Sequence, residues 1–399
     1  MSTPDEKLDQ KPGGSRTGLY AVIAVVVIVI IVVGAAYAAG VFSPKSTSST
    51  SAPPGTCTPP GAVPIAGAGS TFVQGLMATW TASYTEGTAS YDAVGSGSGI
   101  TELTDRSVDF GASDAPLSPA QRGALPGPVV TMPETAGGVA VIYNVPGVPT
   151  LNFTGEVLAE AFMGNITMWN DPQIAALNPG VTLPDQAILI VHRSDGSGTS
   201  FAFSNFLTVS SPVWASLYGK STSPAFPVGS GQHGSSGVGN FVAANQYTLG
   251  YIDLSYALSN NLKFGQVENP SGKFVLPTLA DTASAVADGS GNLPLGTDPD
   301  WYNVSLINEP GAGDYPITTF SYLMVYESLS TVYGSAYNLQ KAENLVDFLN
   351  WTVSANLGQS YSAELYYVPL PAAVIAEDQK TIAAITYNGA AITVCTPTP

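Results

Sequence analysis

The segment from residue 191 to residue 207 carries the side chains best suited to chemistry. It reads Arg-Ser-Asp-Gly-Ser-Gly-Thr over 193–199, between an apolar run that predicts a strand over 187–191 and a pattern that predicts a helix. Unpaired N–H groups at a helix N-terminus attract anions, and glycines let an anion approach the backbone. Ser197, Thr199 and Arg193 add hydroxyl and guanidinium donors. The segment therefore predicts an anion site, although such a loop also serves simply as a helix cap.

Two other segments show the same order of strand, glycine loop and helix. Residues 63–72 run from a predicted strand through Gly-Ala-Gly-Ser-Thr-Phe into a helix with Ser70 as its expected N-cap. Residues 91–103 carry Gly-Ser-Gly-Ser-Gly ahead of a helix. A further apolar run, over 108–117, ends in an acidic turn at Asp114. Asp114 can also be explained simply as a turn-forming residue before a proline. The repeated design favours an anion site built from several loops.

The elements that position these loops alternate between strands and helices. Other predicted strands cover 129–134, 137–144, 249–253 and 316–326. Other predicted helices cover 158–164, 169–177, 235–245 and 342–357. Residues 260–300 are predicted to form loops and hairpins. Phe72, Leu76, Trp80 and Tyr84 recur at a spacing of four and predict a buried helix face. The alternation predicts an α/β fold, in which ligands bind at the carboxyl ends of the strands.

The composition limits the possible partners. The chain has 399 residues and is 45% hydrophobic, which is enough for two domains or lobes. Its net charge of −17, with only 12 Lys plus Arg, excludes nucleic acid as a partner, because that partner needs a basic surface. His192, His233 and two distant cysteines form no cluster of metal ligands, so neither a metal nor another cofactor is expected. An anion site remains possible, because local dipoles dominate in a buried site.

The N-terminal residues carry a membrane signal. Residues 1–17 are polar, with Lys and Arg residues, and 18–42 are almost entirely apolar. Such a run spans a bilayer core of about 30 Å, and the basic residues before it predict a cytoplasmic N-terminus with the rest of the chain outside. A cleavable signal peptide is the alternative, because 36–38 reads Ala-Tyr-Ala, but the run is long for one. We therefore expect a transmembrane anchor.

After the anchor, 43–61 is rich in Ser, Thr and Pro and is interpreted as an extended stalk, followed by a folded domain over 62–396. Cys57 and Cys395 flank that domain, and in an exported chain they are expected to form a disulfide. The glycosylation sequons at Asn152, Asn165, Asn303 and Asn350 are compatible with export.

Four segments, 67–72, 94–99, 108–118 and 193–200, carry a family resemblance. With them, the chain resembles the substrate-binding proteins of phosphate ABC transporters. The resemblance implies a two-lobed periplasmic-binding-protein-like fold of type II with a hinge. Lobe 1 would comprise about 62–142 and 254–396, and lobe 2 about 143–253. One departure is Gly97, where the family loop commonly has a second serine.

The resemblance also implies a set of ligand contacts. Carried over by position, the family's phosphate contacts fall on Thr71, Phe72, Ser96, Asp114, Arg193, Ser197, Gly198 and Thr199. Asp114 would accept a hydrogen bond from the P–OH group of phosphate, whereas sulfate has no proton to give and would be rejected. Asp195 is expected to orient Arg193 rather than to contact the ligand. Binding between the lobes would close the hinge over the anion.

The function that the resemblance implies is that of a membrane-anchored extracellular receptor. It would bind inorganic phosphate and pass it to an ABC permease and its ATPase. One alternative is a receptor for arsenate, phosphonate or another oxyanion. A second is a cell-surface scaffold that keeps the fold without transport. An esterase or phosphatase is disfavoured because the sequence has no Gly-x-Ser-x-Gly and neither histidine lies in a triad context, so the chain is not expected to be an enzyme.

Overall fold

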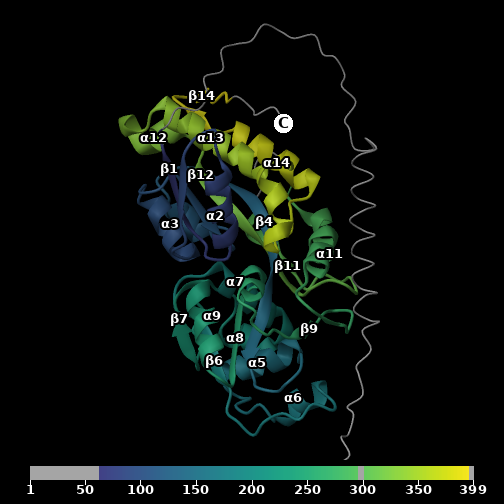
Figure 1. Cartoon of the computed structure of the whole chain (residues 1–399). Coiled ribbons are helices and arrows are strands. Elements are labelled where there is room, and N and C mark those ends of the chain that lie inside the picture. Colours follow the sequence, from purple (N-terminus) through teal and green to yellow (C-terminus); the bar gives the residue numbers. More distant parts are fainter. Residues whose placement is uncertain (1–62, 295–300, 395–399) are drawn as a thin grey trace, which may run out of the picture. The chain divides into compact units, whose positions relative to one another are not determined.

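Strand β4 (Val129–Asn144) connects the two halves of the fold. In the computed structural model, which describes residues 63–294 and 301–394, the first part of β4 pairs with β12 (Ile317–Tyr326) and the last part with β8 (Thr248–Asp253). Figure 1 shows β4 running from the group that contains β1, β12 and α13 to the group that contains β6, α7 and α9. All described residues belong to one compact unit, Cys57–Pro399.

Lobe 1 is built on the sheet order β2-β1-β3-β12-β4, with β11 paired to β12. Its strands besides β12 and β4 are β1 (Ile65–Gly69), β2 (Ala89–Asp92), β3 (Phe110–Ser113) and β11 (Leu306–Ile307), and the helices packed on it are α2 (Gln74–Ser83), α3 (Ser96–Thr104), α11 (Leu279–Gly289), α13 (Leu339–Val353) and α14 (Ala372–Ala383). Strand β1 pairs in parallel with both β2 and β3, so the loops that follow these strands lie at one edge of the sheet.

Lobe 2 continues from the last part of β4 in the order β8-β6-β7. Its other strands are β6 (Leu189–Arg193) and β7 (Ser230–Gln232), and its helices include α5 (Gly155–Met163), α7 (Gly198–Ser210) and α9 (Gly234–Ala244). Helix α10 (Leu254–Ser259) follows β8 directly. Strand β6 is parallel to β7 and β8, so the loops after these strands also share an edge. The predicted α/β alternation is therefore confirmed in both lobes.

Short elements complete the description. They are α4 (Pro119–Ala124), α6 (Pro172–Leu177), α8 (Pro212–Leu217), α12 (Leu329–Tyr333), β5 (Asn152–Phe153), β9 (Gln266–Glu268), β10 (Phe274–Val275), β13 (Thr386–Tyr387), β14 (Ala390–Ala391), and the 3-10 helices η1 (Ser290–Asn292), η2 (Trp301–Asn303), η3 (Gly334–Ala336), η4 (Gly358–Tyr361) and η5 (Ala363–Leu365). Strands β10, β9 and β5 form a separate small sheet.

Three local predictions are wrong. The expected strands over 129–134 and 137–144 are one strand, because Thr135 and Ala136 continue the pairing with β12. Helix α2 starts only at Gln74, with Val73 at the N-cap position and no side-chain cap, and the Ser70 oxygen accepts from the Phe72 N–H ahead of the helix. The segment 260–300 holds the eleven-residue helix α11 as well as a hairpin. The predicted buried face of α2, by contrast, is confirmed, since Leu76 and Trp80 are fully buried.

A β-bulge interrupts the pairing of β4 with β12. Ser321 lies opposite Thr135, and the next residue, Tyr322, lies opposite Pro133. Glu134 is therefore an extra residue in β4, and a bulge of this kind turns the extra side chain out of the regular alternation. Pro133 fits the position, because proline cannot donate to a regular ladder and is found at bulges.

Several predictions concern residues outside the described part of the chain. The predicted anchor (18–42), the stalk (43–61), and the cysteines Cys57 and Cys395 with their disulfide all lie there. Among the described residues, we find no helix whose length and apolar character would allow it to cross a membrane.

Gly99 is expected to be essential for the packing of α3 on β1. A Cβ on Gly99 would lie 2.4 Å from the Cα of Gly69 and 2.6 Å from the Ala68 carbonyl oxygen, and both are backbone atoms. Gly99→Ala should lower the free energy of unfolding by about 1–3 kcal/mol, measured by denaturant titration. Gly123→Ala, at an exposed helical position with nothing within 4 Å, is the control and should be neutral or stabilising. Equal effects of the two substitutions would contradict the packing argument.

Candidate anion-binding site

The Asp114 carboxyl group is the centre of the candidate site. Asp114 follows β3 and is 1% exposed. Its Oδ1 accepts hydrogen bonds from Ser70 Oγ (2.6 Å) and Ser321 Oγ (2.9 Å). Its Oδ2 is buried and has no hydrogen-bond partner among the described residues. A buried carboxylate oxygen left in this state is unfavourable, so Oδ2 is available to accept a hydrogen bond from a ligand.

The N-terminus of α7 in lobe 2 lies directly against Asp114. A Cβ on Gly198 would be 2.6 Å from both the Cβ and the amide nitrogen of Asp114, so only glycine fits. The next hydroxyl, Thr199 Oγ1, lies close enough to lower the pKa of Asp114, yet it is buried with no hydrogen-bond partner in the described part of the chain. One acceptor and one donor, both without partners, thus lie near each other between the lobes.

The electrostatics of Asp114 reflect this environment. Burial raises its pKa to about 6, against the lowering effects of the Ser70 and Ser321 hydroxyls, the Arg193 charge and the Thr199 hydroxyl. At pH 7 the group is therefore mainly ionised and is ready to accept a hydrogen bond.

Arg193, at the end of β6, supplies the positive charge. It is buried, and its guanidinium donates from Nε (2.8 Å) and Nη2 (2.5 Å) to the two oxygens of Asp195. Although burial acts in the opposite direction, these bonds and the Arg193 charge hold the pKa of Asp195 below its ordinary value. The Gly234 N–H also donates to Asp195 Oδ1 at 3.0 Å. The two bonds use two of the five donors of a guanidinium and fix its plane.

Hydrogen bonds between the glycine loops connect the two lobes. Thr71 Oγ1 lies 3.1 Å from Ser235 Oγ and accepts from the Ser235 N–H at 3.2 Å. The Gly198 N–H donates to Ser96 Oγ at 3.1 Å, and the Gly97 N–H donates to the carbonyl oxygen of residue 196 at 2.8 Å. The departure at Gly97 has a physical reason, because a Cβ there would lie 3.0 Å from the Cα of Gly196.

Two other predicted contact residues have clear local roles. Phe72 is buried, its N–H donates to Ser70 Oγ at 3.0 Å, and its carbonyl oxygen accepts from Tyr367 Oη at 2.6 Å. Ser197 caps α7, because its Oγ accepts from the Ser200 N–H at 3.1 Å. The cap uses the oxygen of Ser197 as an acceptor and leaves its hydroxyl hydrogen for another partner.

The sequence-based interpretation missed residues that surround Asp114. They are Ser70, Glu134, Ser235, Asp253 and Ser321. Ser235 is the first residue of the helix predicted over 235–245, so a signal for it existed. Asp253 caps α10 through Oδ1, and its Oδ2 makes no hydrogen bond of ordinary length within the described ranges. Burial raises its pKa to about 7, against the lowering effect of the nearby Ser235 hydroxyl. Glu134 and Ser321 lie inside β4 and β12, away from any glycine loop, and gave no local signal.

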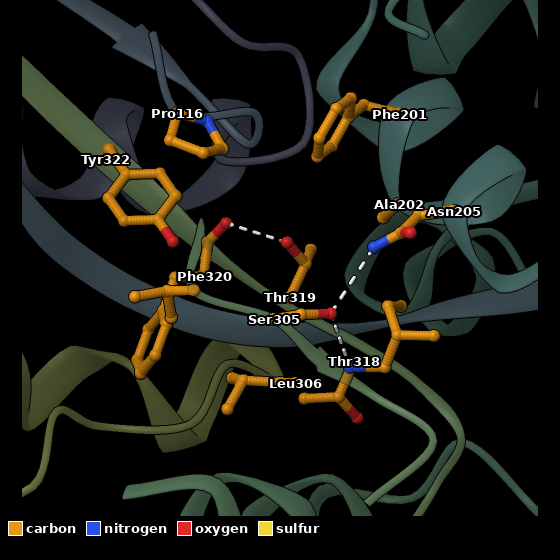
Figure 2. A pocket seen from close by; sticks show the side chains of 12 residues that line it. Pro116, Phe201, Ala202, Asn205, Ser305, Leu306, Thr318, Thr319, Phe320 and Tyr322 are labelled. Carbon is orange, nitrogen blue, oxygen red and sulfur yellow. Dashed lines mark hydrogen bonds between the residues drawn. The ribbon is translucent and has the colours of Figure 1, made fainter. Parts of the chain in front are cut away.

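A small cavity of about 20 Å³ is lined by residues of α7, β11 and β12. It is lined by Phe201 and Asn205 of α7 and by Pro116, Ser305 and Thr319, as Figure 2 shows, with Asn205 Nδ2 donating to Ser305 Oγ at 3.3 Å. It has room for about one water molecule and is next to Asp114, whose carbonyl oxygen accepts from Thr319 Oγ1. The described residues hold no group of His, Cys, Asp and Glu suited to bind a metal ion.

Similar proteins give this geometry its context. A protein of Pasteurella multocida named phosphate-binding protein PstS is 35% identical over 323 residues, which cover 79% of this chain and 88% of that protein. A protein of Methanocaldococcus jannaschii with the same name is 32% identical over 332 residues, which cover 78% and 84%. A model of the PBP superfamily domain matches residues 44–356. The chain belongs to the PstS family of substrate-binding proteins.

Solved structures of phosphate-binding proteins share the fold of this PstS-family chain. The periplasmic protein PfluDING matches with a TM-score of 0.62 at 23% identity, covering 79% of this chain and 92% of that one. A human phosphate binding apolipoprotein matches with a TM-score of 0.64 at 20% identity, covering 78% and 92%. At this identity the likeness concerns the fold alone, and it confirms the predicted two-lobed periplasmic-binding-protein-like architecture.

The ligand-free protein is expected to be more stable at mildly acidic pH than at pH 8. Asp114, Glu134 and Asp253 have folded-state pKa values of about 6, 8 and 7, all raised above their ordinary values. Their contribution to stability is complete below the unfolded pKa of about 4 and is lost as pH rises through 6 to 8. The midpoint of thermal unfolding should therefore fall between pH 5 and pH 8 in scanning calorimetry. A midpoint that rises across this window would contradict the assignment.

Proposed function

We propose that this protein binds inorganic phosphate between its two lobes and delivers it to the permease of an ABC transporter. The observation that carries the proposal is the Asp114 carboxylate, whose Oδ1 accepts hydrogen bonds from two hydroxyl groups while Oδ2 is buried with no partner in the part of the chain that the structure describes. Membership of the PstS family supports the same ligand, since the relatives are named phosphate-binding proteins.

The chemistry of the residues suits a protonated tetrahedral oxyanion. Phosphate keeps at least one proton near neutral pH, and that P–OH group donates to Asp114 Oδ2. Its acceptor oxygens take hydrogen bonds from the Arg193 guanidinium and the Thr199 hydroxyl. Sulfate has no proton, so its oxygens would face the carboxylate, and an unpaired buried group costs about 1–3 kcal/mol. Arsenate carries a proton like phosphate, and this makes it the alternative ligand to test.

The remaining contacts come from the loops that connect the lobes. Thr71, Phe72 and Ser96 supply donors from lobe 1, and Ser197 and Gly198 supply donors from the N-terminus of α7. The N–H groups of Phe72 and Gly198 donate to serine hydroxyls in this structure, so phosphate binding exchanges these bonds for bonds to the ligand. The positive end of the α7 dipole adds to the attraction for an anion.

The cellular setting follows from the N-terminal sequence. Residues 18–42 anchor the protein in the cell membrane with the N-terminus in the cytoplasm, and 43–61 extend the binding domain (62–396) outside the cell. The hinge divides that domain into lobe 1 (about 62–142 and 254–396) and lobe 2 (about 143–253). A disulfide between Cys57 and Cys395 joins the two ends of the domain. The protein partners are the permease and its ATPase, and the bound phosphate is passed on without chemical change.

Calorimetric titration of the folded, ligand-free protein tests the ligand. Phosphate should bind with micromolar or tighter affinity, and sulfate should give no heat. Asp114→Asn should weaken phosphate binding by about 10–100-fold and reduce discrimination against sulfate, because the amide can donate to an oxygen that carries no proton. Asp92→Asn, at an exposed position on β2, is the charge-matched control and should bind like the wild type.

Two results of this titration would contradict the proposal. Absence of heat with phosphate would remove the receptor function and favour the surface scaffold. Tight arsenate binding with weak phosphate binding would keep the receptor but change its cargo.

Membrane anchoring is tested by fractionation of cells that make the full chain. The protein should stay in the membrane fraction, and its mass should show that the N-terminal residues are still present. A variant lacking residues 1–42 should be found in the soluble fraction. If cells that make the full chain instead yield a soluble product that begins after residue 38, the segment is a cleaved signal peptide.

A further inference from the structure

A single serine hydroxyl bridges two buried carboxyl groups next to the candidate site. Ser321 Oγ lies 2.9 Å from Asp114 Oδ1 and 2.8 Å from Glu134 Oε1, and all three residues are almost completely buried. Glu134 reaches this position because it is the extra residue of the bulge in β4, directly beside Ser321 of β12. The bridge joins the carboxyl group that faces the ligand to one that does not.

Counting hydrogens at this bridge fixes the protonation state. A serine hydroxyl has one hydrogen, so it can donate to only one of the two carboxyl oxygens. If both carboxyl groups were ionised, a lone pair of Ser321 would face a charged oxygen at 2.8–2.9 Å. Both contacts are hydrogen bonds only if one carboxyl group is protonated and donates to Ser321.

The surroundings place this proton on Glu134. Asp114 has the hydroxyls of Ser70, Ser321 and Thr199 and the charge of Arg193 to stabilise its ionised form. Glu134 has the Ser321 hydroxyl, and its Oε2 is buried with no partner within the described residues. Burial, with a further contribution from the Asp114 charge, raises the pKa of Glu134 to about 8, against about 6 for Asp114.

We propose that Glu134 is a neutral hydrogen-bond donor which, through Ser321, positions the ionised Asp114 carboxylate to accept a hydrogen bond from the protonated oxygen of the bound anion. The hydrogen bonds run from Glu134 to Ser321 and from Ser321 to Asp114 Oδ1. The Ser70 hydroxyl donates to the same oxygen, because its own oxygen already accepts the Phe72 N–H. Oδ2 alone is left for the ligand. Glu134 is a positioning residue, and the proposal rests on phosphate binding at Asp114.

Other titratable groups around this bridge behave differently between pH 6 and 9. Tyr91 and Tyr367 face Glu134, and burial raises their pKa values well above 10, so they stay neutral. Burial does the same for Tyr322 beside Asp114. Gln359, which donates to the Glu134 carbonyl oxygen, does not titrate. Asp253 titrates near pH 7 but lies on β8 beside Ser235, so a variant must separate its effect from that of Glu134.

The proposal predicts a loss of affinity at alkaline pH that depends on Glu134. Ionised Glu134 adds a second negative charge near the anion and takes the Ser321 hydrogen away from Asp114. With a pKa of about 8, this lowers phosphate affinity by up to about tenfold between pH 7 and pH 9. Glu134→Gln cannot ionise, and its amide N–H can still donate to Ser321, so this part of the loss should disappear.

The experiment is calorimetric titration with inorganic phosphate at pH 7 and pH 9 for the wild type, Glu134→Gln and Glu156→Gln. The ratio of the two affinities within each protein cancels effects on folding, and comparison between proteins cancels the titration of phosphate itself. Glu156, exposed at the start of α5, is the charge-matched control and should give the wild-type ratio. Glu134→Gln should reduce the ratio by up to about tenfold.

Proton uptake gives a second readout that a purely structural role would not change. At pH 8 about half of Glu134 is ionised in the free protein, so phosphate binding should take up about half a proton more in the wild type than in Glu134→Gln. Titrations in buffers of different ionisation enthalpy measure this number. Equal uptake and equal affinity ratios in the two proteins would overturn the role of Glu134 while leaving phosphate binding intact.

The ligand-free protein provides a further check. An infrared difference spectrum at pH 7 between the wild type and Glu134→Gln should contain the band of a protonated carboxylic acid. A spectrum that contains only carboxylate bands would overturn the proposal. Absence of phosphate binding by the wild type at pH 7 would overturn the proposed function together with this inference. Phosphate binding without an effect of Glu134→Gln would overturn the inference alone, so the two failures are distinguishable.

Discussion

The unequal environments of the two oxygens of Asp114 determine what the site can bind. Oδ1 accepts hydroxyl groups from the loop after β1 and from β12, whereas Oδ2 is buried with no partner among the described residues. The hydrogen bonds to Oδ1 fix the orientation of the carboxylate. Oδ2 remains a buried acceptor, which only a hydrogen-bond donor can satisfy. Under the proposed function, selection for an anion that carries a proton would follow from these two facts, and Arg193 would neutralise the remaining charge.

The rest of the fold brings the two sides of this site together. Parallel strands in each lobe end in glycine loops at one edge of the sheet. Strand β4 joins the two lobes, because it pairs with β12 in lobe 1 and with β8 in lobe 2. Gly198 allows the N-terminus of α7 to approach the backbone of Asp114 to a distance that a side chain would prevent. A hinge between the proposed lobes would separate Asp114 from Arg193 and Thr199, so closure and ligand recognition would depend on the same contacts.

The parts of the site that are encoded locally could be predicted from the sequence. Glycine-hydroxyl loops, the acidic turn at Asp114 and the pair Arg193 and Asp195 are each contained in a few consecutive residues. Glu134 and Ser321 could not be found this way, because they are 187 residues apart and meet only through strand pairing and a bulge. Helix α11 was missed because its buried face, formed by Thr282, Ala285, Val286 and Gly289, contains only one large aliphatic side chain. Local chemistry was therefore predictable, whereas its support by distant residues was not.

The most direct test of this account is a crystal structure of the protein grown with phosphate at pH 7. We expect one phosphate oxygen within hydrogen-bond distance of Asp114 Oδ2, and other oxygens bound to the Arg193 guanidinium and Thr199 Oγ1. Phosphate bound elsewhere in the protein, with no ligand oxygen at Asp114 Oδ2, would contradict the central claim that this carboxylate recognises the proton of the anion.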